Sequence, residues 1–106
     1  MDEVAWYFGN TTQIEAVGQK AANGLGTYDM SGNVWEWCND YYGDYDPAQT
    51  TDPTGPNSGT HRVIRGGSWE YEAYYLRNTN RSKCKPDLSY GKVNTNIGFR
   101  VIEILP

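Results

Sequence analysis

The chain has 106 residues, of which 38% are hydrophobic, and a formal net charge of -4 with only nine Lys and Arg residues. This length suits one domain with a single core, and the sparse basic charge excludes an electrostatic footprint for nucleic acid or an anionic membrane. No apolar run reaches the roughly 20 residues of a membrane-spanning helix, and the first ten residues do not resemble a signal peptide, so we expect a soluble chain without membrane insertion. The sequence does not indicate the compartment in which the protein acts.

The first third of the chain is expected to form one short helix and an ordered loop. Asp2 can cap a helix through Phe8, because apolar residues recur at helical spacing until Gly9 supplies a stop. The run from Asn23 to Asn33 holds three glycines and three Asn or Asp residues, which favour backbone conformations closed to branched side chains. We expect this run to be a loop that leads into a strand.

The middle of the chain predicts two strands joined by a long loop. Val34–Tyr42 is rich in β-forming residues and predicts a strand. Gly43–Arg62 is dense in Pro, Gly, Thr and Asp without apolar periodicity, so it predicts a surface loop. Arg62–Arg65 is a short strand that ends at a glycine pair, where backbone must approach backbone closely.

The last third of the chain is expected to add strands at the two ends of an irregular segment. Residues 73–81 are a candidate strand, residues 83–96 are irregular, and Ile97–Ile104 is a strong β segment. Together the elements predict an α+β fold with a short irregular antiparallel sheet, long loops and little helix.

Three separated segments, GLGTYDMSGNVWEWC, RVIRGGSW and IGFRV, resemble in order and spacing the C-terminal half of the formylglycine-generating enzyme (sulfatase-modifying factor) family. DEVAWYFGN and VGQKAANGLGTYDM also resemble bacterial members, so the likeness covers nearly all of the chain. The resemblance implies a C-type-lectin-like fold, in which a small sheet carries long loops that present a ligand surface. Because family domains are usually much longer, it also implies that residues 1–106 are a single domain shortened at the N-terminus.

The resemblance implies a structural calcium ion beside Glu36. In the family the equivalent glutamate is helped by backbone carbonyls of the preceding loop, which here would come from Ser31, Gly32 and Val34. Calcium takes several oxygen ligands, and a glycine-containing turn can aim carbonyls inward. The alternative is a partly buried carboxylate that backbone N–H groups or an arginine satisfy between two packing tryptophans. Both interpretations stay open, and either makes Glu36 part of the scaffold.

The cysteines decide whether the resemblance extends to catalysis. Family members that make formylglycine use two cysteines after the GGS motif to hold copper and the substrate thiol, and soft thiolates suit Cu(I). This chain has no cysteine between Gly66 and Lys83, while Cys84 follows the matching segment and Cys38 is expected to be buried packing. We therefore expect no copper and no catalytic residue. The alternative is a fragment of a formylglycine-generating oxidase or a related sulfur-chemistry enzyme.

Four aspartates in and just before the long loop carry a weaker signal of a calcium site. They lack the regular alternation and closing glutamate of an EF-hand, so they are interpreted as a solvated rim. The residues concerned are Asp40, Asp44, Asp46 and Asp52.

Glu70–Asn96 is the candidate binding surface. Tyrosine among small polar residues is typical of adaptable recognition, because tyrosine gives a large contact area at low entropy cost. The placement resembles that in variable proteins of diversity-generating retroelements, which diversify this stretch of the same scaffold. The resemblance implies a non-catalytic module that binds a protein, peptide or glycan, and the alternative is that the tyrosines pack against the sheet. The candidate binding residues are Glu70, Tyr71, Glu72, Tyr74, Asn78, Asn80, Lys83, Lys85, Ser89, Tyr90, Lys92, Asn94 and Asn96.

Overall fold

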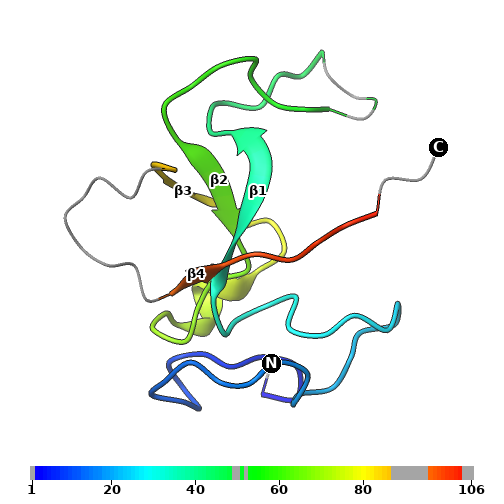
Figure 1. The fold of residues 1–106 in the computed structure, drawn as a ribbon, viewed down its shortest axis with the longest axis vertical. Helices are drawn as coiled ribbons and strands as arrows, with labels where there is room; N and C mark the ends of the chain where they lie inside the picture. Colours follow the sequence, from blue (N-terminus) through cyan, green and yellow to red (C-terminus); the bar gives the residue numbers. More distant parts are fainter. Residues whose placement is uncertain (1, 49–50, 52, 87–95, 104–106) are drawn as a thin grey trace.

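A four-stranded sheet of order β3-β2-β1-β4 forms the centre of the computed structural model, which describes residues 2–48, 51, 53–86 and 96–103 (Figure 1). Its elements are β1 (Trp35–Tyr41), β2 (Arg62–Arg65), the 3-10 helix η1 (Ala73–Leu76), β3 (Ser82–Cys84) and β4 (Ile97–Gly98). Loops and turns make up the rest of the described chain, as the predicted α+β class with little helix requires. No helix among these residues has the length and apolar character to cross a membrane.

The strand pairing confirms two predicted strands and corrects one feature of the sheet. β1 and β2 lie within one residue of their expected bounds and pair antiparallel, with Trp37 opposite Ile64. β4 instead runs parallel to β1, with Trp35 opposite Ile97, so the sheet is mixed and not purely antiparallel. Parallel neighbours need a long crossover connection, and the chain between β1 and β4 supplies it.

The expected helix at the N-terminus is wrong. Residues 2–4 and 8–10 form turns, and Trp6 pairs with Gly32 in an isolated parallel bridge. The backbone N–H of Asn33 also donates to the Trp6 carbonyl over 2.7 Å. An isolated helix of seven residues is marginal in water, so these tertiary hydrogen bonds outweigh the local helical pattern.

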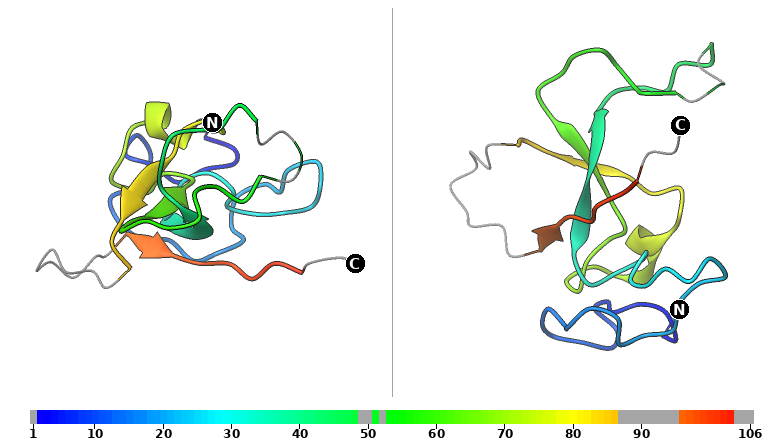
Figure 2. Two further views of the ribbon diagram at one scale, coloured as in Figure 1. Left: turned by 90° about the horizontal axis from the view of Figure 1, so that it is seen from above. Right: turned by 45° about the vertical axis from the view of Figure 1, so that its right-hand side comes forward.

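Three further expectations need correction in the last third of the chain. Residues 73–81 are not a strand, because they form η1 and a turn. β3 (Ser82–Cys84) extends into residues 83–96, which were expected to be irregular. β4 ends at Gly98 and not at Ile104, which lies outside the described residues. Beyond β4 the chain leaves the sheet (Figure 2), and Arg100 turns back to contact Glu36.

The main hydrophobic cluster lies on one face of the sheet. Alternate residues of a strand point to opposite faces, so Trp35 and Trp37 face the core while Glu36 points away from it. The cluster contains buried Trp35, Ile64 and Cys84, with Trp37, Tyr71 and Ile97 packed against them. Both tryptophans beside Glu36 therefore serve the scaffold.

Candidate ligand-binding site

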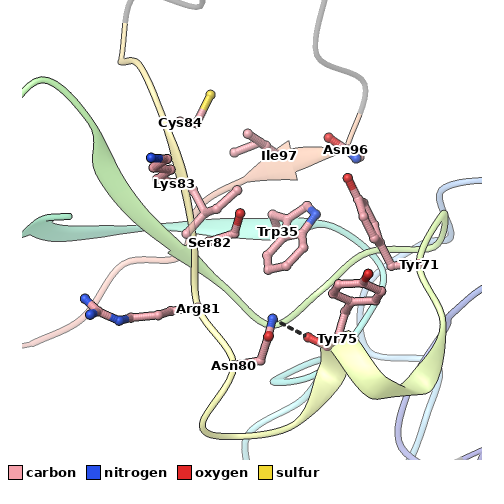
Figure 3. A pocket seen from close by; sticks show the side chains of 11 residues that line it. Trp35, Tyr71, Tyr75, Asn80, Arg81, Ser82, Lys83, Cys84, Asn96 and Ile97 are labelled. Atoms are coloured by element: carbon pink, nitrogen blue, oxygen red, sulfur yellow. Dashed lines mark hydrogen bonds between the residues drawn. The ribbon is translucent and has the colours of Figure 1, made fainter. Parts of the chain in front are cut away.

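A pocket of about 440 Å³ opens between η1, β3 and the start of β4, over the core face of the sheet (Figure 3). The buried scaffold residues form its floor, and residues after the GGSW motif form its walls. It is lined by Trp35, Ile64, Tyr71, Tyr75, Asn80, Arg81, Ser82, Lys83, Cys84, Asn96 and Ile97. We call it the ladder pocket, after the aromatic rings described next.

An aromatic ladder of four rings runs from the core to the surface beside this pocket. The ring centroids of Trp35 and Tyr71 are 5.3 Å apart, those of Tyr71 and Tyr75 are 5.2 Å apart, and both pairs meet edge to face. Tyr74 adds a fourth ring 5.3 Å from Tyr75. Such pairs stabilise by about 0.5–1.5 kcal/mol beyond their burial. Tyr75 is 40% exposed, so the ladder ends in an ordered ring that a ligand can reach.

The polar wall of the ladder pocket is basic and amide-rich. The Asn80 side chain donates to the Tyr75 carbonyl over 3.0 Å, which ties the turn after η1 to the ladder. Arg81 donates to the Gly43 carbonyl over 2.6 Å, and Lys83 is exposed. The described residues that line this pocket include no carboxylate. The wall therefore favours ligand groups that accept hydrogen bonds or carry negative charge.

The structure gathers some of the candidate binding residues and separates others. Four of them line the ladder pocket, namely Tyr71, Asn80, Lys83 and Asn96. Five lie in the described chain but outside this pocket, namely Glu70, Glu72, Tyr74, Asn78 and Lys85. Ser89, Tyr90, Lys92 and Asn94 lie outside the described residues.

Sequence reasoning missed several lining residues. Tyr75, Arg81 and Ser82 belong to the same segment, but no periodicity marks which side chains of an irregular segment share a face. Cys84 also lines the ladder pocket, although its place after the matching motif indicated a displaced position. It is buried in the core cluster against Trp35.

The two cysteines lie on opposite faces of the sheet and form no disulfide. Cys84 belongs to the core face, whereas Cys38 is two residues from Glu36 on β1 and is half-buried rather than fully buried. Burial raises the pKa of the Cys38 thiol, an effect that nearby Arg65 opposes. This arrangement does not fit a copper site built from two thiolates. Within the described chain, no three His, Cys, Asp or Glu residues are grouped to hold a metal ion.

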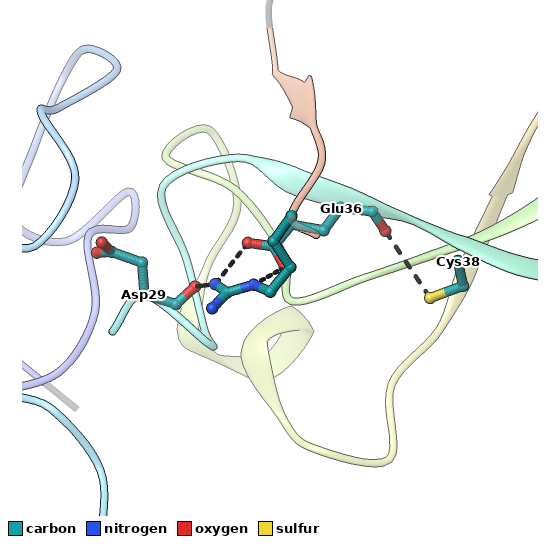
Figure 4. Close-up of polar contacts among 4 residues, drawn as sticks. Asp29, Glu36 and Cys38 are labelled. Atoms are coloured by element: carbon teal, nitrogen blue, oxygen red, sulfur yellow. Dashed lines mark hydrogen bonds and ion pairs between the residues drawn. The ribbon is translucent and has the colours of Figure 1, made fainter. Parts of the chain in front are cut away.

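Glu36 is paired with Arg100 on the face away from the core (Figure 4). The Arg100 Nε donates to Oε1 over 2.6 Å and its Nη2 donates to Oε2 over 2.7 Å, which is a bidentate ion pair. Nη2 also donates to the Asp29 carbonyl over 2.8 Å. The hydrogen bond to Glu36 raises the pKa of Arg100. The alternative interpretation of Glu36, a carboxylate satisfied by an arginine, therefore describes the structure.

Asp29 lies beside this ion pair, and Figure 4 shows its carboxylate turned away from Arg100 and Glu36. Asp29, Val34 and Glu36 line a pocket of about 360 Å³ together with Arg100. The Asp29 Oδ1 atom is buried and accepts no hydrogen bond, while Oδ2 accepts from the Gly18 N–H over 2.8 Å. Two other predicted calcium-binding residues make hydrogen bonds within the protein. The Gly32 N–H donates to the Gly66 carbonyl, and the Ser31 hydroxyl donates to the Leu76 carbonyl. A calcium ion at Glu36 would have to replace the guanidinium of Arg100.

Comparison with known proteins gives one family and several relatives. The family model described as "Sulfatase-modifying factor enzyme 1-like domain" matches residues 3–105. The serine/threonine-protein kinase pkn1 of Chlamydia caviae is 44% identical over 84 residues, which is 74% of this chain and 13% of that protein. The formylglycine-generating enzyme of Streptomyces coelicolor is 43% identical over 83 residues, which is 74% of this chain and 25% of that protein.

A solved structure extends the likeness to the fold. Treponema denticola variable protein 1 superposes with a TM-score of 0.80 at 37% identity, over 92% of this chain and 35% of that chain. This likeness confirms the expected C-type-lectin-like fold of the formylglycine-generating-enzyme type. The chain spans about a third or less of the length of each of these three proteins.

Proposed function

Because the chain belongs to the family of sulfatase-modifying factor enzyme 1-like domains, we propose that it is a non-catalytic module that binds a protein, peptide or glycan in the ladder pocket. The observation that carries this proposal is the aromatic ladder, in which Tyr75 packs against Tyr71 and Tyr71 packs against the core residue Trp35. A ring ordered before binding loses little entropy when a ligand packs against it.

The likeness to a variable protein of Treponema denticola supports a more specific form of the proposal. In this form the Glu70–Asn96 segment is the part that a diversity-generating retroelement alters, while β1, β2 and β4 keep the fold. The described part of this segment supplies most of the ladder-pocket wall, and β1 and β2 supply the floor. A change at the exposed wall residues Tyr75 and Lys83 would then alter the ligand without disturbing the core beneath them.

The position of the thiols supports the non-catalytic part of the proposal. Copper chemistry of the family type needs two soft ligands and the substrate thiol at one place. Here Cys84 is the one cysteine on the ladder pocket, because Cys38 lies on the other face of the sheet. We therefore propose that the chain takes no copper at this pocket.

A second candidate function is an enzyme fragment of the same family. The 43% identity to a formylglycine-generating enzyme favours it, together with the presence of one thiol in the ladder pocket. Such a fragment would need a second soft ligand from residues other than those described. Oxygen uptake in the presence of a cysteine peptide distinguishes this candidate from a binding module.

Replacing Tyr75 with alanine tests the ladder pocket. Ligands are first selected from a peptide library displayed on phage and from a glycan array with the unmodified chain. Tyr75→Ala should weaken the binding of the selected ligands about fivefold, since packing on an exposed aromatic ring contributes about 1 kcal/mol. The thermal midpoint should fall by only a few degrees, because the ring is 40% exposed. Affinity is measured by calorimetry.

Tyr28→Ala is the matched control, since Tyr28 is 48% exposed and lies outside the ladder pocket. It should leave the affinity of every selected ligand unchanged. Equal losses of affinity in the two variants, or no loss in either variant, would show that the ligands bind outside the ladder pocket.

We also propose that calcium acts as a structural ion at Glu36, in exchange for the Arg100 guanidinium. The Glu36 carboxylate and the Asp29 backbone carbonyl, which both accept hydrogen bonds from Arg100, are oxygen ligands of the kind that calcium takes. Titration with calcium chloride should release heat and raise the thermal midpoint of the unmodified chain. Glu36→Gln, which keeps the size of the side chain, should abolish both effects. Calcium binding that survives Glu36→Gln, or none in the unmodified chain, would refute the proposed site.

A further inference from the structure

A further pocket, of about 430 Å³, is lined by the end of β1, the long loop between β1 and β2, and Arg81. This loop lies at the far end of the sheet from the N-terminal segment (Figure 1). The rings of Tyr41 and Tyr45 and the prolines Pro53 and Pro56 give it apolar walls. We call it the loop pocket. Apart from Arg81, its lining residues lie outside the Glu70–Asn96 segment, so it is distinct from the ladder pocket.

The charge of the loop pocket is strongly unbalanced. Asp40, Asp44 and Asp46 line it, and Arg81 is the one basic residue among the described lining residues, which leaves a formal charge of -2. None of these carboxylates forms an ion pair within the part of the chain that the structure describes. The Arg81 guanidinium lies at one wall of this pocket, where it donates to the Gly43 carbonyl over 2.6 Å instead of pairing with an aspartate. Asp40 is also half-buried, which is not the environment of a solvated rim.

The tyrosines at this end of the sheet already bind cations from within the chain. The Arg81 guanidinium carbon lies 4.0 Å from the Tyr45 ring centroid, and that of Arg62 lies 3.7 Å from the Tyr41 centroid. Aromatic faces attract guanidinium and ammonium groups through the ring quadrupole. Tyr45 is 71% exposed, so most of its surface remains accessible beyond the contact with Arg81.

We propose that the loop pocket is a second binding site, which takes an arginine or lysine side chain of a partner protein. Apolar walls hold the methylene stem of such a side chain, and the unpaired carboxylates attract its charged end. A neutral glycan would not compensate the formal charge of -2 of the loop pocket, and an anionic ligand would be repelled by it. Arg81 lines both pockets, so one partner could place a cation in the loop pocket and a hydrogen-bond acceptor in the ladder pocket.

The test uses two blocked tripeptides that differ only in charge, acetyl-Gly-Arg-Gly-amide and acetyl-Gly-citrulline-Gly-amide. Each is titrated into the isotope-labelled chain while the amide resonances of Gly43, Tyr45 and Gly55 are followed. The arginine peptide should shift these resonances until they saturate. The citrulline peptide should bind at least about fivefold more weakly, because citrulline has no positive charge. Added salt should weaken the arginine peptide and leave the citrulline peptide unaffected.

Two double variants of equal net charge show whether the effect is local. Asp44→Asn with Asp46→Asn should weaken the arginine peptide about fivefold, whereas Glu3→Gln with Glu103→Gln, at exposed positions outside the loop pocket, should not. Equal binding of the two peptides, equal losses in the two variants, or comparable shifts with maltose would overturn the proposal. The measurement does not depend on any ligand of the ladder pocket, so its failure is distinct from failure of the proposed function.

Discussion

Replacing Trp35 with alanine is expected to lower the free energy of unfolding by about 3–5 kcal/mol. The side chain is 3% exposed and packs against Ile64 and Cys84 at the centre of the sheet. Its loss also removes the ring beneath Tyr71, so the aromatic ladder loses its base. Urea denaturation followed by circular dichroism measures the change.

Tyr74→Ala is the control for this prediction. Tyr74 belongs to the same ladder but is 60% exposed, so its removal should cost about 0.5 kcal/mol or less. If Trp35→Ala does not fold, Trp35→Phe should give a smaller and measurable loss, because it keeps an aromatic ring. Similar small losses for Trp35→Ala and Tyr74→Ala would contradict the position of Trp35 in the core.

Replacing Gly32 with alanine is expected to cost about 2–5 kcal/mol, from backbone strain and steric overlap together. Gly32 has φ +81°, and a Cβ atom there would lie 2.3 Å from the Trp6 carbonyl oxygen. To relieve the overlap the N-terminal segment would have to move, which would strain the hydrogen bond from the Asn33 N–H to that same oxygen. Thermal and urea denaturation measure the loss.

Gly26→Ala separates the two contributions. Gly26 has nearly the same backbone angle, φ +79°, but a Cβ atom there would meet nothing within 4 Å. This variant should therefore show only the strain, of about 1–2 kcal/mol. Equal losses at Gly26 and Gly32 would mean that the N-terminal segment does not pack on Gly32 as the structure shows.

Local signals sufficed for the two central strands and for the loop before them. β1 and β2 are rich in β-forming residues and are bounded by turn-forming residues, so pattern and structure agree there. In the loop before β1, Asp29 and Asn33 adopt positive φ angles with Gly26 and Gly32, as its composition indicates. The N-terminal segment was mispredicted because its hydrogen-bond partners lie about 26 residues away, at Gly32 and Asn33.

The candidate site was predicted in part for a similar reason. The amphipathic composition of Glu70–Asn96 indicated the correct segment, and Tyr71, Asn80, Lys83 and Asn96 do line the ladder pocket. The choice of individual side chains failed at Tyr75 and Arg81, because η1 and the turn after it place them by tertiary contacts. The loop pocket was not foreseen, since its carboxylates come from β1 and the loop after it, whereas Arg81 comes from the distant segment before β3.

The role of Glu36 follows from its strand position. Period-two alternation places it away from the core, between two tryptophans that face inward, and Arg100 reaches it from beyond β4. The pair connects the two parallel strands at the edge of the sheet. Glu36 thus acts as scaffold in this structure, while the ladder pocket lies on the opposite face.

The central claim is that this scaffold binds a partner without thiol-based oxygen chemistry. It is tested most directly by oxygen uptake of the chain with Cu(I) and a cysteine-containing peptide. With Cys84 and Cys38 on opposite faces of the sheet, uptake should not exceed that of Cu(I) and peptide alone. Catalytic uptake that is lost in Cys84→Ser and retained in Cys38→Ser would contradict the account.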